Sequence, residues 1–360
     1  MLRLDTITLT RFKNYFERQF VFTERIVGFC GPNGAGKTNL LDAIYYLCLT
    51  KSYFARTDIS SSSFGFPGFR IEGHFSRQHE KFTTVCILRE NGKKEFILNQ
   101  EVYSKFSQHI GKFPVVFVAP DDVQLVTGGS EERRKFIDTI ISQLDPQYLH
   151  YLIQYSRVLL QRNGLLKQMS ETGIVDEALL EVLDQQLVLP GEYIFSQRKS
   201  FLDTYIHEVL LKYEMIAGKE EGLGLSYQSP LQQQDFSGLL KMARQRDIAT
   251  QRTTSGIHKD ELDIRLGDLP LKNIASQGQR KSLLFAMKLA EFSVLQRFKG
   301  FPPVLLLDDV FEKLDESRMH NLLQWACVEN KGQVFLTDTH CSRLKDALLK
   351  LALPFQVENL

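Results

Sequence analysis

Hydrophobic and polar residues alternate in the first part of the chain. Apolar side chains recur at every second or third position over residues 2–9 and again over 20–22, which predicts an opening pair of β-strands. A continuous apolar run at residues 26–30 predicts a buried strand. Residues 82–89 and 93–98 flank an Asn-Gly pair, which is a strong hairpin signal. The first third of the chain is therefore predicted to be rich in strands.

The period becomes helical between residues 131 and 218. Apolar residues are spaced three or four apart there, at Phe136, Ile140, Ile141, Leu149, Leu152, Leu180, Leu183 and Leu187. Pro146, Gly164, Gly173 and Pro190 interrupt the pattern, so no heptad run of coiled-coil length is expected.

From about residue 250 the pattern returns to mixed helix and strand, with strand-like segments at 304–307 and 333–337. The sequence thus predicts an α/β domain built from both ends of the chain, residues 1–124 and 251–360. A compact helical lobe at residues 125–250 would be inserted into it.

A glycine-rich loop stands between the apolar strand and a helical pattern. Its glycines allow backbone N–H groups to turn inward around phosphate oxygens, Lys37 can reach the β- and γ-phosphates, and the Thr38 hydroxyl suits Mg²⁺. The following helix adds the positive end of its dipole. The pattern predicts an ATP-binding loop formed by Gly31, Pro32, Asn33, Gly34, Ala35, Gly36, Lys37 and Thr38.

Two adjacent acids follow the apolar strand at residues 304–307. A buried strand seldom ends in neighbouring carboxylates without a partner cation. We expect Asp308 to hold Mg²⁺ through water and Asp309 to act as a general base beside the attacking water, with Lys37 as the other catalytic residue.

A second predicted helix N-terminus that could bind an anion precedes this strand. Ser276 and Gln279 have the spacing of a capping box, and Gly278 permits close backbone approach. The segment Ser276, Gln277, Gly278 and Gln279 is therefore a further candidate for phosphate recognition.

Composition limits the partners and the compartment. Lys and Arg total 44 against 43 Asp and Glu in 360 residues, so any nucleic-acid surface must be local. The five cysteines lie far apart without a Cys-x-x-Cys pair, and we expect them to be reduced and structural. There is no apolar signal region and no uninterrupted apolar run of about 18 residues, which predicts a cytoplasmic protein without a membrane span.

Local basic clusters are the candidates for contact with DNA phosphates. One lies between residues 241 and 259, where five basic residues face a single acid, and a second lies at residues 133–135. The candidate residues are Arg244, Arg246, Arg252, Arg133 and Arg134.

With these motifs in order, the chain resembles a known family. The segment at residues 276–279 stands where ABC-type ATPases carry their signature motif, and Asp315 stands where they carry the D-loop aspartate. Further segments are similar to the bacterial RecF family of recombinational repair proteins over essentially the whole chain. They are Phe12-Lys13-Asn14-Tyr15, Ala119-Pro120-Asp121-Asp122, Gly129-Ser130, residues 133–138, and Gly256-Ile257-His258-Lys259-Asp260.

The resemblance implies an ABC-type P-loop ATPase head carrying the helical lobe. It also implies a protein that dimerises on ATP, binds single-stranded, gapped or duplex DNA, and cooperates with RecO and RecR to place RecA at gaps. Recombinational repair, replication and SOS induction would be the setting, and ATP hydrolysis would be weak and used as a switch. In related dimers the signature segment serves the partner's nucleotide.

Two positions depart from the ABC pattern. Asp309 stands where the usual residue is Glu, so its carboxylate is one methylene short, and slow hydrolysis is expected. His340 follows one residue later than the switch histidine of transporters, and no glutamine stands out as the Q-loop residue. Three rival interpretations remain. One is a structural-maintenance head, although such heads need long heptad arms, and another is a transporter ATPase. The third is a metabolic P-loop kinase, which would not need the signature segment.

Overall fold

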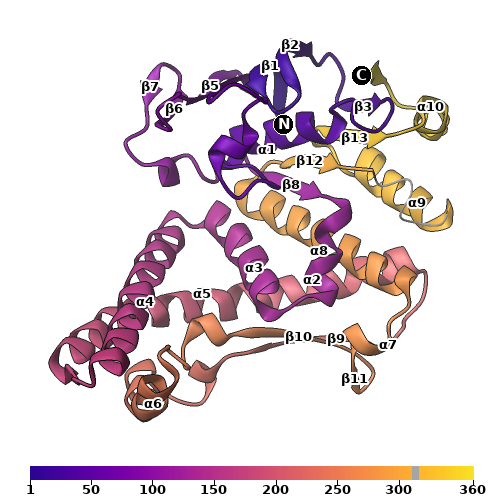
Figure 1. Cartoon of the computed structure of the whole chain (residues 1–360). Coiled ribbons are helices and arrows are strands. Elements are labelled where there is room, and N and C mark those ends of the chain that lie inside the picture. Colours follow the sequence, from indigo (N-terminus) through magenta and orange to yellow (C-terminus); the bar gives the residue numbers. More distant parts are fainter. Residues whose placement is uncertain (310–315) are drawn as a thin grey trace. The chain divides into compact units, whose positions relative to one another are not determined.

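The computed structural model describes residues 1–309 and 316–360, and these residues form two compact units. Unit 1 comprises Met1–Asp122, Leu211–Lys219 and Gln277–Leu360. Unit 2 comprises Val123–Leu210 and Glu220–Ser276. Figure 1 shows their elements along the chain. Both ends of the sequence thus belong to one unit.

An antiparallel sheet of six strands forms the first layer of unit 1. Its order is β2-β1-β4-β5-β6-β7. The predicted opening pair is confirmed, because β1 and β2 pair with Ile7 opposite Phe20, and the predicted Asn-Gly hairpin joins β5 to β6. The strands are β1 (Leu2–Phe12), β2 (Tyr15–Val21), β4 (Phe69–Arg77), β5 (Glu80–Leu88), β6 (Lys94–Leu98) and β7 (Glu101–Val102).

A parallel sheet of five strands forms the second layer, in the order β14-β3-β13-β12-β8. Every pairing in it is parallel, so the carboxyl ends of β3, β13 and β12 lie at one edge. The strands are β3 (Ile26–Cys30), β8 (Val115–Val118), β12 (Val304–Leu307), β13 (Val334–Asp338) and β14 (Phe355–Asn359). Ligands of open parallel sheets bind at this edge.

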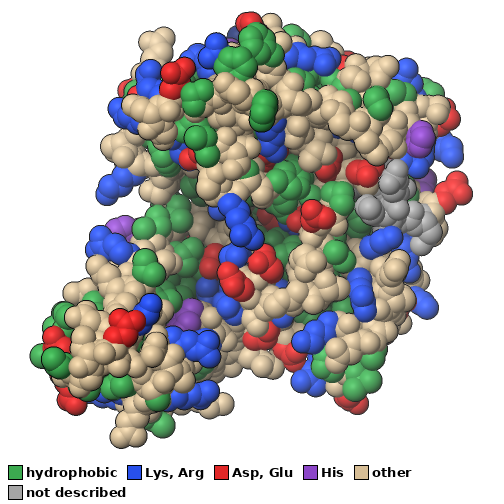
Figure 2. Space-filling view, viewed as in Figure 1, with side chains coloured by type: hydrophobic (Ala, Val, Ile, Leu, Met, Phe, Trp, Pro, Cys, Tyr) green, Lys and Arg blue, Asp and Glu red, His purple; other side chains and the backbone are tan. Residues whose placement is uncertain are grey.

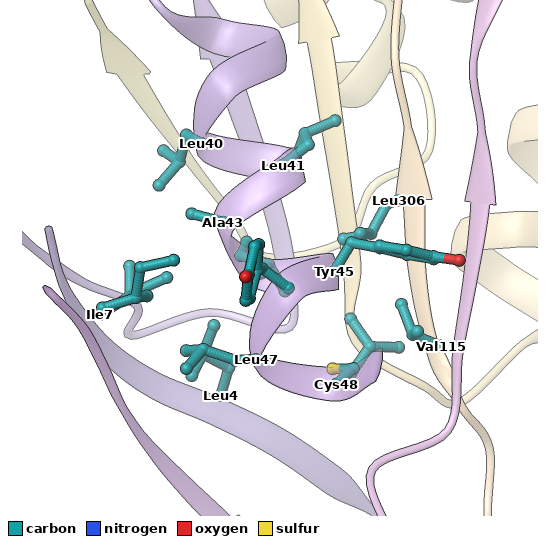
Figure 3. Close-up of a cluster of buried hydrophobic side chains, with 14 of the residues drawn as sticks. Leu4, Ile7, Leu40, Leu41, Ala43, Tyr45, Leu47, Cys48, Val115 and Leu306 are labelled. Carbon is teal, nitrogen blue, oxygen red and sulfur yellow. The ribbon is translucent and has the colours of Figure 1, made fainter. Parts of the chain in front are cut away.

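Helix α1 (Lys37–Leu49) packs against both sheets and is buried over most of its length. Figure 3 shows Leu4 and Ile7 of β1 on one side of this helix, with Val115 of β8 and Leu306 of β12 on the other. The other principal helices of the described part of unit 1 are α8 (Gln277–Lys299), α9 (Glu316–Leu323), which continues as a π-helix over Gln324–Glu329, and α10 (Cys341–Leu349). The core therefore positions the start of α1 at the edge where the parallel strands end.

Unit 2 is mainly helical and contains a sheet of three antiparallel strands in the order β11-β10-β9. The strands are β9 (Leu223–Gln228), β10 (Glu261–Leu266) and β11 (Leu269–Pro270). The helices are α2 (Gln124–Thr127), α3 (Ser130–Leu144), α4 (Pro146–Thr172), α5 (Glu177–Ala217), α6 (Phe236–Thr250) and α7 (Leu271–Ile274). The last residues of α5, from Leu211, belong to unit 1.

The structure differs from the sequence-based boundaries in two respects. The sequence predicts that residues 251–276 belong to the α/β domain. In the structure they lie in unit 2, because β10 pairs with β9 there. Pro190 and Gly164 do not interrupt helices: α5 runs for 41 residues through Pro190, and α4 runs for 27 residues through Gly164. Burial of Leu183, Leu187 and Ile194 along α5 offsets the loss of one backbone hydrogen bond at the proline.

Buried arginines organise the polar interior of unit 2. Arg162 is fully buried, and its guanidinium contacts Asp184 at 2.6 Å and Asp247 at 2.7 Å. Arg198 contacts Asp138 at 2.9 Å and Asp260 at 2.6 Å. These buried ion pairs favour one arrangement of the helices that carry them.

Candidate nucleotide-binding site

The glycine-rich loop lies between β3 and α1, as the sequence predicts. Its glycines at positions 31, 34 and 36 all have positive φ angles, a region that residues with a Cβ rarely adopt. Gly36 is also constrained by packing, because a Cβ there would lie 2.5 Å from Asn14 Nδ2 and 2.7 Å from the Tyr15 hydroxyl. The loop conformation therefore requires glycine for both backbone and packing reasons.

Lys37 is the first residue of α1, and its side chain curls back over the loop. Its Nζ donates hydrogen bonds to the carbonyl oxygens of Gly31 at 2.7 Å and Pro32 at 2.9 Å. The side chain is buried, with 7% of the residue exposed. The ammonium group is thus held at the mouth of the loop, where phosphate oxygens would enter.

Asp308 faces the loop from the end of β12. The Thr38 hydroxyl donates to both of its carboxylate oxygens, at 3.1 and 2.9 Å, and the Thr337 hydroxyl donates to Oδ1 at 2.7 Å. Burial raises the pKa of Asp308, while the hydrogen bonds from Thr337 and Thr38 act in the opposite direction. The fold thereby joins two predicted motifs that are 270 residues apart.

Asp309 follows in a left-handed conformation with φ of 48°. Its backbone N–H donates to the Thr337 hydroxyl at 2.8 Å. Asp is among the few residues other than glycine that tolerate this region. Asp309 reaches the same cavity as Asp308.

A cavity of ≈ 220 Å³ connects these groups. All residues that line it belong to unit 1. They are Asn33, Gly34, Gly36, Lys37, Thr38, Asn39, Asp308, Asp309, Thr337 and Thr339. One wall supplies backbone N–H groups and an ammonium, and the other supplies carboxylates and hydroxyls, which suits an anion bound together with a cation.

The oxygen donors at this site fit Mg²⁺. Thr38 and Asp308 present a hydroxyl and a carboxylate, the hard ligands that this cation prefers. The part of the chain that the structure describes contains no cluster of three or more acidic, His or Cys side chains able to enclose a metal. A cation here would need phosphate oxygens and water as its remaining ligands, as is usual for Mg²⁺ bound with a nucleotide.

Two residues that support the loop were not predicted as site residues, although both lie in the Phe12-to-Tyr15 segment. Asn14 Nδ2 donates to the Ala35 carbonyl at 3.2 Å, and Asn14 Oδ1 accepts from Asn39 at 2.7 Å. The Tyr15 hydroxyl donates to the Gly36 carbonyl at 3.1 Å. The turn between β1 and β2 thus braces the phosphate loop from outside.

The candidate signature segment lies at the point of the chain where unit 2 ends and unit 1 resumes. Ser276 and Gln277 are exposed, Gln277 begins α8, and none of residues 276–279 lines the cavity. Gly278 packs near Arg318, whose guanidinium donates to the Ser282 hydroxyl at 2.5 Å. Asp315, the candidate D-loop residue, lies outside the described residues.

His340 directly precedes α10 and is exposed. Its backbone N–H donates to Asp338 Oδ1 at 3.2 Å. It does not line the cavity, whereas Thr337 at the end of β13 and Thr339 just after it do. Within this segment, hydroxyl groups rather than the imidazole face the phosphate loop.

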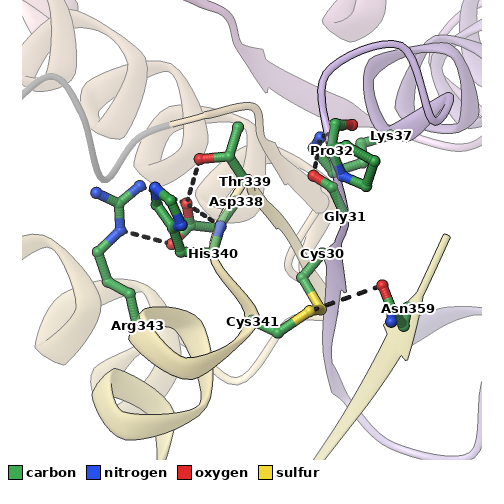
Figure 4. The surroundings of a disulfide bond; sticks show 10 residues. All are labelled: Cys30, Gly31, Pro32, Lys37, Asp338, Thr339, His340, Cys341, Arg343 and Asn359. Atoms are coloured by element: carbon green, nitrogen blue, oxygen red, sulfur yellow. Dashed lines mark hydrogen bonds and ion pairs between the residues drawn. A yellow bond between two sulfur atoms is a disulfide. The ribbon is translucent and has the colours of Figure 1, made fainter.

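The expectation that all five cysteines are reduced is wrong for two of them, because Cys30 and Cys341 form a disulfide (Figure 4). Parallel pairing of β3 with β13 places Cys30 opposite Asp338, three residues before Cys341. The two cysteines are separated by 311 positions in the sequence, so no local spacing pattern could reveal that they are close. Cys48, Cys86 and Cys327 are free and buried.

The basic candidates for DNA contact divide into two groups. Arg133 is buried and binds Glu261 at 2.8 Å, Arg134 is half-buried and donates to the Asp260 carbonyl at 2.7 Å, and Arg244 contacts Asp184 at 3.2 Å. This placement argues against a DNA role for Arg133. Arg246 and Arg252, by contrast, are exposed.

Basic and acidic side chains are interspersed over the face shown in Figure 2, in keeping with the net charge of +1. No helix within residues 1–309 and 316–360 combines the length and hydrophobicity that a membrane span requires.

Comparisons with known proteins agree with this geometry. Residues 3–352 match the family model described as RecF/RecN/SMC N terminal domain. The chain is 40% identical to the DNA replication and repair protein RecF of Flavobacterium johnsoniae, with all of both chains covered. It is also 40% identical to RecF of Parabacteroides distasonis, over 97% of this chain and 94% of that one.

Solved structures show the same relationship. A structure described as the recombination mediator protein RecF-ATP in the RecFOR pathway aligns with a TM-score of 0.87 and 27% identity, covering 95% of this chain and 93% of that chain. An Smc head domain from Pyrococcus furiosus aligns with a TM-score of 0.55 and 16% identity, covering 98% of this chain and 92% of that chain, a likeness of fold alone. These matches confirm the predicted α/β head of the ABC and SMC type. The chain therefore belongs to the RecF family of DNA replication and repair proteins.

Proposed function

We propose that this protein is an ATP-dependent DNA-binding protein of recombinational repair and replication. The observation that carries the proposal is the Thr38 hydroxyl bound to both carboxylate oxygens of Asp308 beside the phosphate loop. That contact assembles a triphosphate and Mg²⁺ site from segments 270 residues apart. The RecF structure with ATP, whose fold this chain shares over 95% of its length, supports the same nucleotide.

Each group of the site has a role in this proposal. The backbone N–H groups that follow Pro32 in the loop and the Lys37 ammonium bind the β- and γ-phosphates, and Thr38 with Asp308 holds Mg²⁺. Bound Mg²⁺ supplies charge neutralisation at the phosphates. Asp309 orients the attacking water and accepts its proton. Because its carboxylate is one methylene short of a Glu, turnover is slow, and the nucleotide acts as a switch.

Two copies of the chain close around ATP in this proposal. Ser276 is exposed directly before α8 and does not line the cavity of its own chain, which supports a role for it at the nucleotide of a second copy. Residues 276–279 of one copy and Lys37 of the other then form two equivalent sites about a two-fold axis. Nucleotide binding and dimerisation are thereby coupled.

DNA binding is directed mainly at phosphates, with Arg246 and Arg252 as candidate contacts because both are exposed. We place the protein in the cytoplasm, where the dimer would act with RecO and RecR to load RecA at single-strand gaps and so support SOS induction. The family name of the relatives supports the repair setting.

The test is to measure binding to gapped, single-stranded and plain duplex DNA in parallel, with and without ATP. We expect ATP-dependent binding with preference for the gapped substrate, and loss of ATP dependence in Lys37→Met. ATP-dependent binding without preference would indicate a nonspecific DNA ATPase, and binding that ignores ATP would refute the switch.

A further inference from the structure

We propose that Cys30 and Cys341 are a reversible thiol–disulfide site that reacts with low-molecular-weight disulfides and adjusts the affinity of the neighbouring nucleotide cavity. The effect on nucleotide rests on the proposed ATP-binding function, whereas the chemistry of the cysteines does not. The site lies in unit 1, and the residues around the disulfide are shown in Figure 4.

The packing of the fold places the two cysteines next to each other. Cys30 is the last residue of β3, and Cys341 is the first residue of α10, which follows β13. Helix α10 packs directly on β3, since a Cβ at Gly28 would lie 2.8 Å from Leu344 Cδ2. The Cα atoms of the two cysteines are 5.1 Å apart, within the range that a disulfide needs.

The two cysteines differ in exposure to solvent, and this difference determines which of them reacts first. Cys341 is partly exposed at the N-terminus of α10, and a helix N-terminus favours the thiolate form. Cys30 is fully buried in the parallel sheet. Cys341 is therefore the thiol that meets a small reagent, and Cys30 is the thiol that resolves the product.

The reaction balances with a small disulfide such as oxidised glutathione as the oxidant. The Cys341 thiolate attacks one sulfur of the reagent, which breaks the reagent's S–S bond and releases one small thiolate. Cys30 loses its proton and attacks the Cys341 sulfur of the mixed disulfide, which releases the second small thiolate. Two protein thiols and one small disulfide thus give one protein disulfide and two small thiols, and a dithiol reductant reverses the exchange.

The remaining cysteines do not compete. Cys48, Cys86 and Cys327 are free but buried in unit 1. Burial raises the pKa of each thiol well above its usual value, to about 12 for Cys327, so all three stay protonated and shielded. Reaction is therefore confined to the pair beside the phosphate loop. In a reducing compartment disulfides are usually transient or redox-sensing, and a pair with one partly exposed cysteine suits that role.

The disulfide joins the two elements that supply opposite walls of the cavity. Cys30 immediately precedes Gly31, whose carbonyl holds Lys37 at 2.7 Å. Cys341 follows the end of β13 and the turn after it, which supply Thr337 and Thr339 to the cavity. A covalent link between these elements reduces their relative freedom before nucleotide binds, and such preorganisation raises affinity. We expect the oxidised protein to bind an ATP analogue about three- to tenfold more tightly than the reduced protein.

The chemistry is tested on the full chain, reduced with dithiothreitol, freed of reductant and treated with oxidised glutathione. Remaining thiols are alkylated and the peptides mapped by mass spectrometry. We expect a Cys30–Cys341 link in the parent, a glutathione adduct retained on Cys341 in Cys30→Ala, and no reaction of Cys30 in Cys341→Ser. Failure of the parent to form the link, or reaction spread over the three buried cysteines, would overturn the site.

The effect on nucleotide is tested by titrating a fluorescent ATP analogue into oxidised and reduced protein. Cys341→Ser should bind equally under both conditions, and Cys327→Ala, which removes another buried cysteine, should keep the parent's difference. Equal affinities of oxidised and reduced parent would overturn the control of binding even if the link forms. Absence of ATP binding in both states would refute the proposed function instead, and peptide mapping would still decide the cysteine chemistry.

Discussion

Substitution of Gly36 by alanine tests the account of the phosphate loop most directly. Gly36 has φ of 109°, where a residue with a Cβ is strained by about 1–3 kcal/mol. The new Cβ would also lie 2.5 Å from Asn14 Nδ2 and 2.7 Å from the Tyr15 hydroxyl. Asn14 is exposed and can move, but Tyr15 is buried and would lose its hydrogen bond to the Gly36 carbonyl.

Loss of that hydrogen bond adds about 0.5–1.5 kcal/mol. Alanine also reduces the conformational entropy of the unfolded chain, which stabilises the folded state by roughly 0.4–1 kcal/mol. The expected decrease in the free energy of unfolding for Gly36→Ala is therefore about 2–3 kcal/mol. Gly34→Ala is the matched control, because its φ of 86° carries the backbone strain but its Cβ would meet no atom within 4 Å. It should lose only about 1–2 kcal/mol.

The assay is urea unfolding without nucleotide, followed by the fluorescence of the single tryptophan, Trp325, which is buried in unit 1. Tyr15→Phe alone should cost about 1 kcal/mol, because the Gly36 carbonyl still accepts from Leu40 N–H at 2.9 Å. In the Gly36→Ala background the same change should cost nothing, since the hydroxyl is already displaced. Equal losses for the two glycine variants, or strict additivity of Tyr15→Phe with Gly36→Ala, would refute the packing argument.

Other predictions concern the nucleotide, DNA and pH. Lys37→Met should abolish ATP-dependent dimerisation in light scattering while leaving the circular dichroism spectrum unchanged, and dimers of the parent that form without nucleotide would contradict it. Asp309→Asn should slow phosphate release in a turnover assay but keep ATP affinity, whereas undiminished turnover would place the base elsewhere. Arg246→Ala with Arg252→Ala should make the log–log salt dependence of duplex DNA binding shallower by about 0.9 for each phosphate that is no longer neutralised, and an unchanged slope excludes both residues. Burial raises the pKa of Glu291 to about 7 from 4.5, so the stability given by its protonated form is complete below pH 4.5 and is lost as the pH rises through 7. Glu291→Gln should therefore raise the free energy of unfolding at pH 8 by about 1–3 kcal/mol and leave it nearly unchanged at pH 4 in the same fluorescence assay.

The parts of the site that sequence could predict are those encoded within a short segment. The phosphate loop needs a strand, three glycines and a helix in succession, and all stand within residues 26–49. The carboxylates at the end of β12 are encoded in the same way, by an apolar run followed by two acids. Their meeting was predictable because the carboxyl ends of parallel strands share an edge.

The parts that sequence could not predict depend on contacts between distant segments. Asn14 and Tyr15 brace the loop only because the β1–β2 turn lies beside it, and Cys30 meets Cys341 only through the pairing of β3 with β13. The predicted interruption of the helix at Pro190 is wrong for the same reason, because the packing of α5 outweighs the low helix propensity of proline. Contacts between distant segments therefore determine which residues support the site from outside.

Buried polar contacts extend from the phosphate-loop region to the helix that carries residues 277–279. Lys13, next to the loop-bracing Asn14, binds Asp42 of α1 at 2.6 Å, and Asp42 accepts from the Tyr53 backbone at 2.6 Å. The Tyr53 hydroxyl donates to Asp122 and accepts from Lys288 of α8 at 3.3 Å. Partnered polar groups in a low-dielectric interior hold one geometry strongly, because any shift leaves a buried group unpaired. Within unit 1, the position of α8 is thus tied to that of α1, and a displacement of the phosphate loop that moves α1 must also strain the contacts that hold α8.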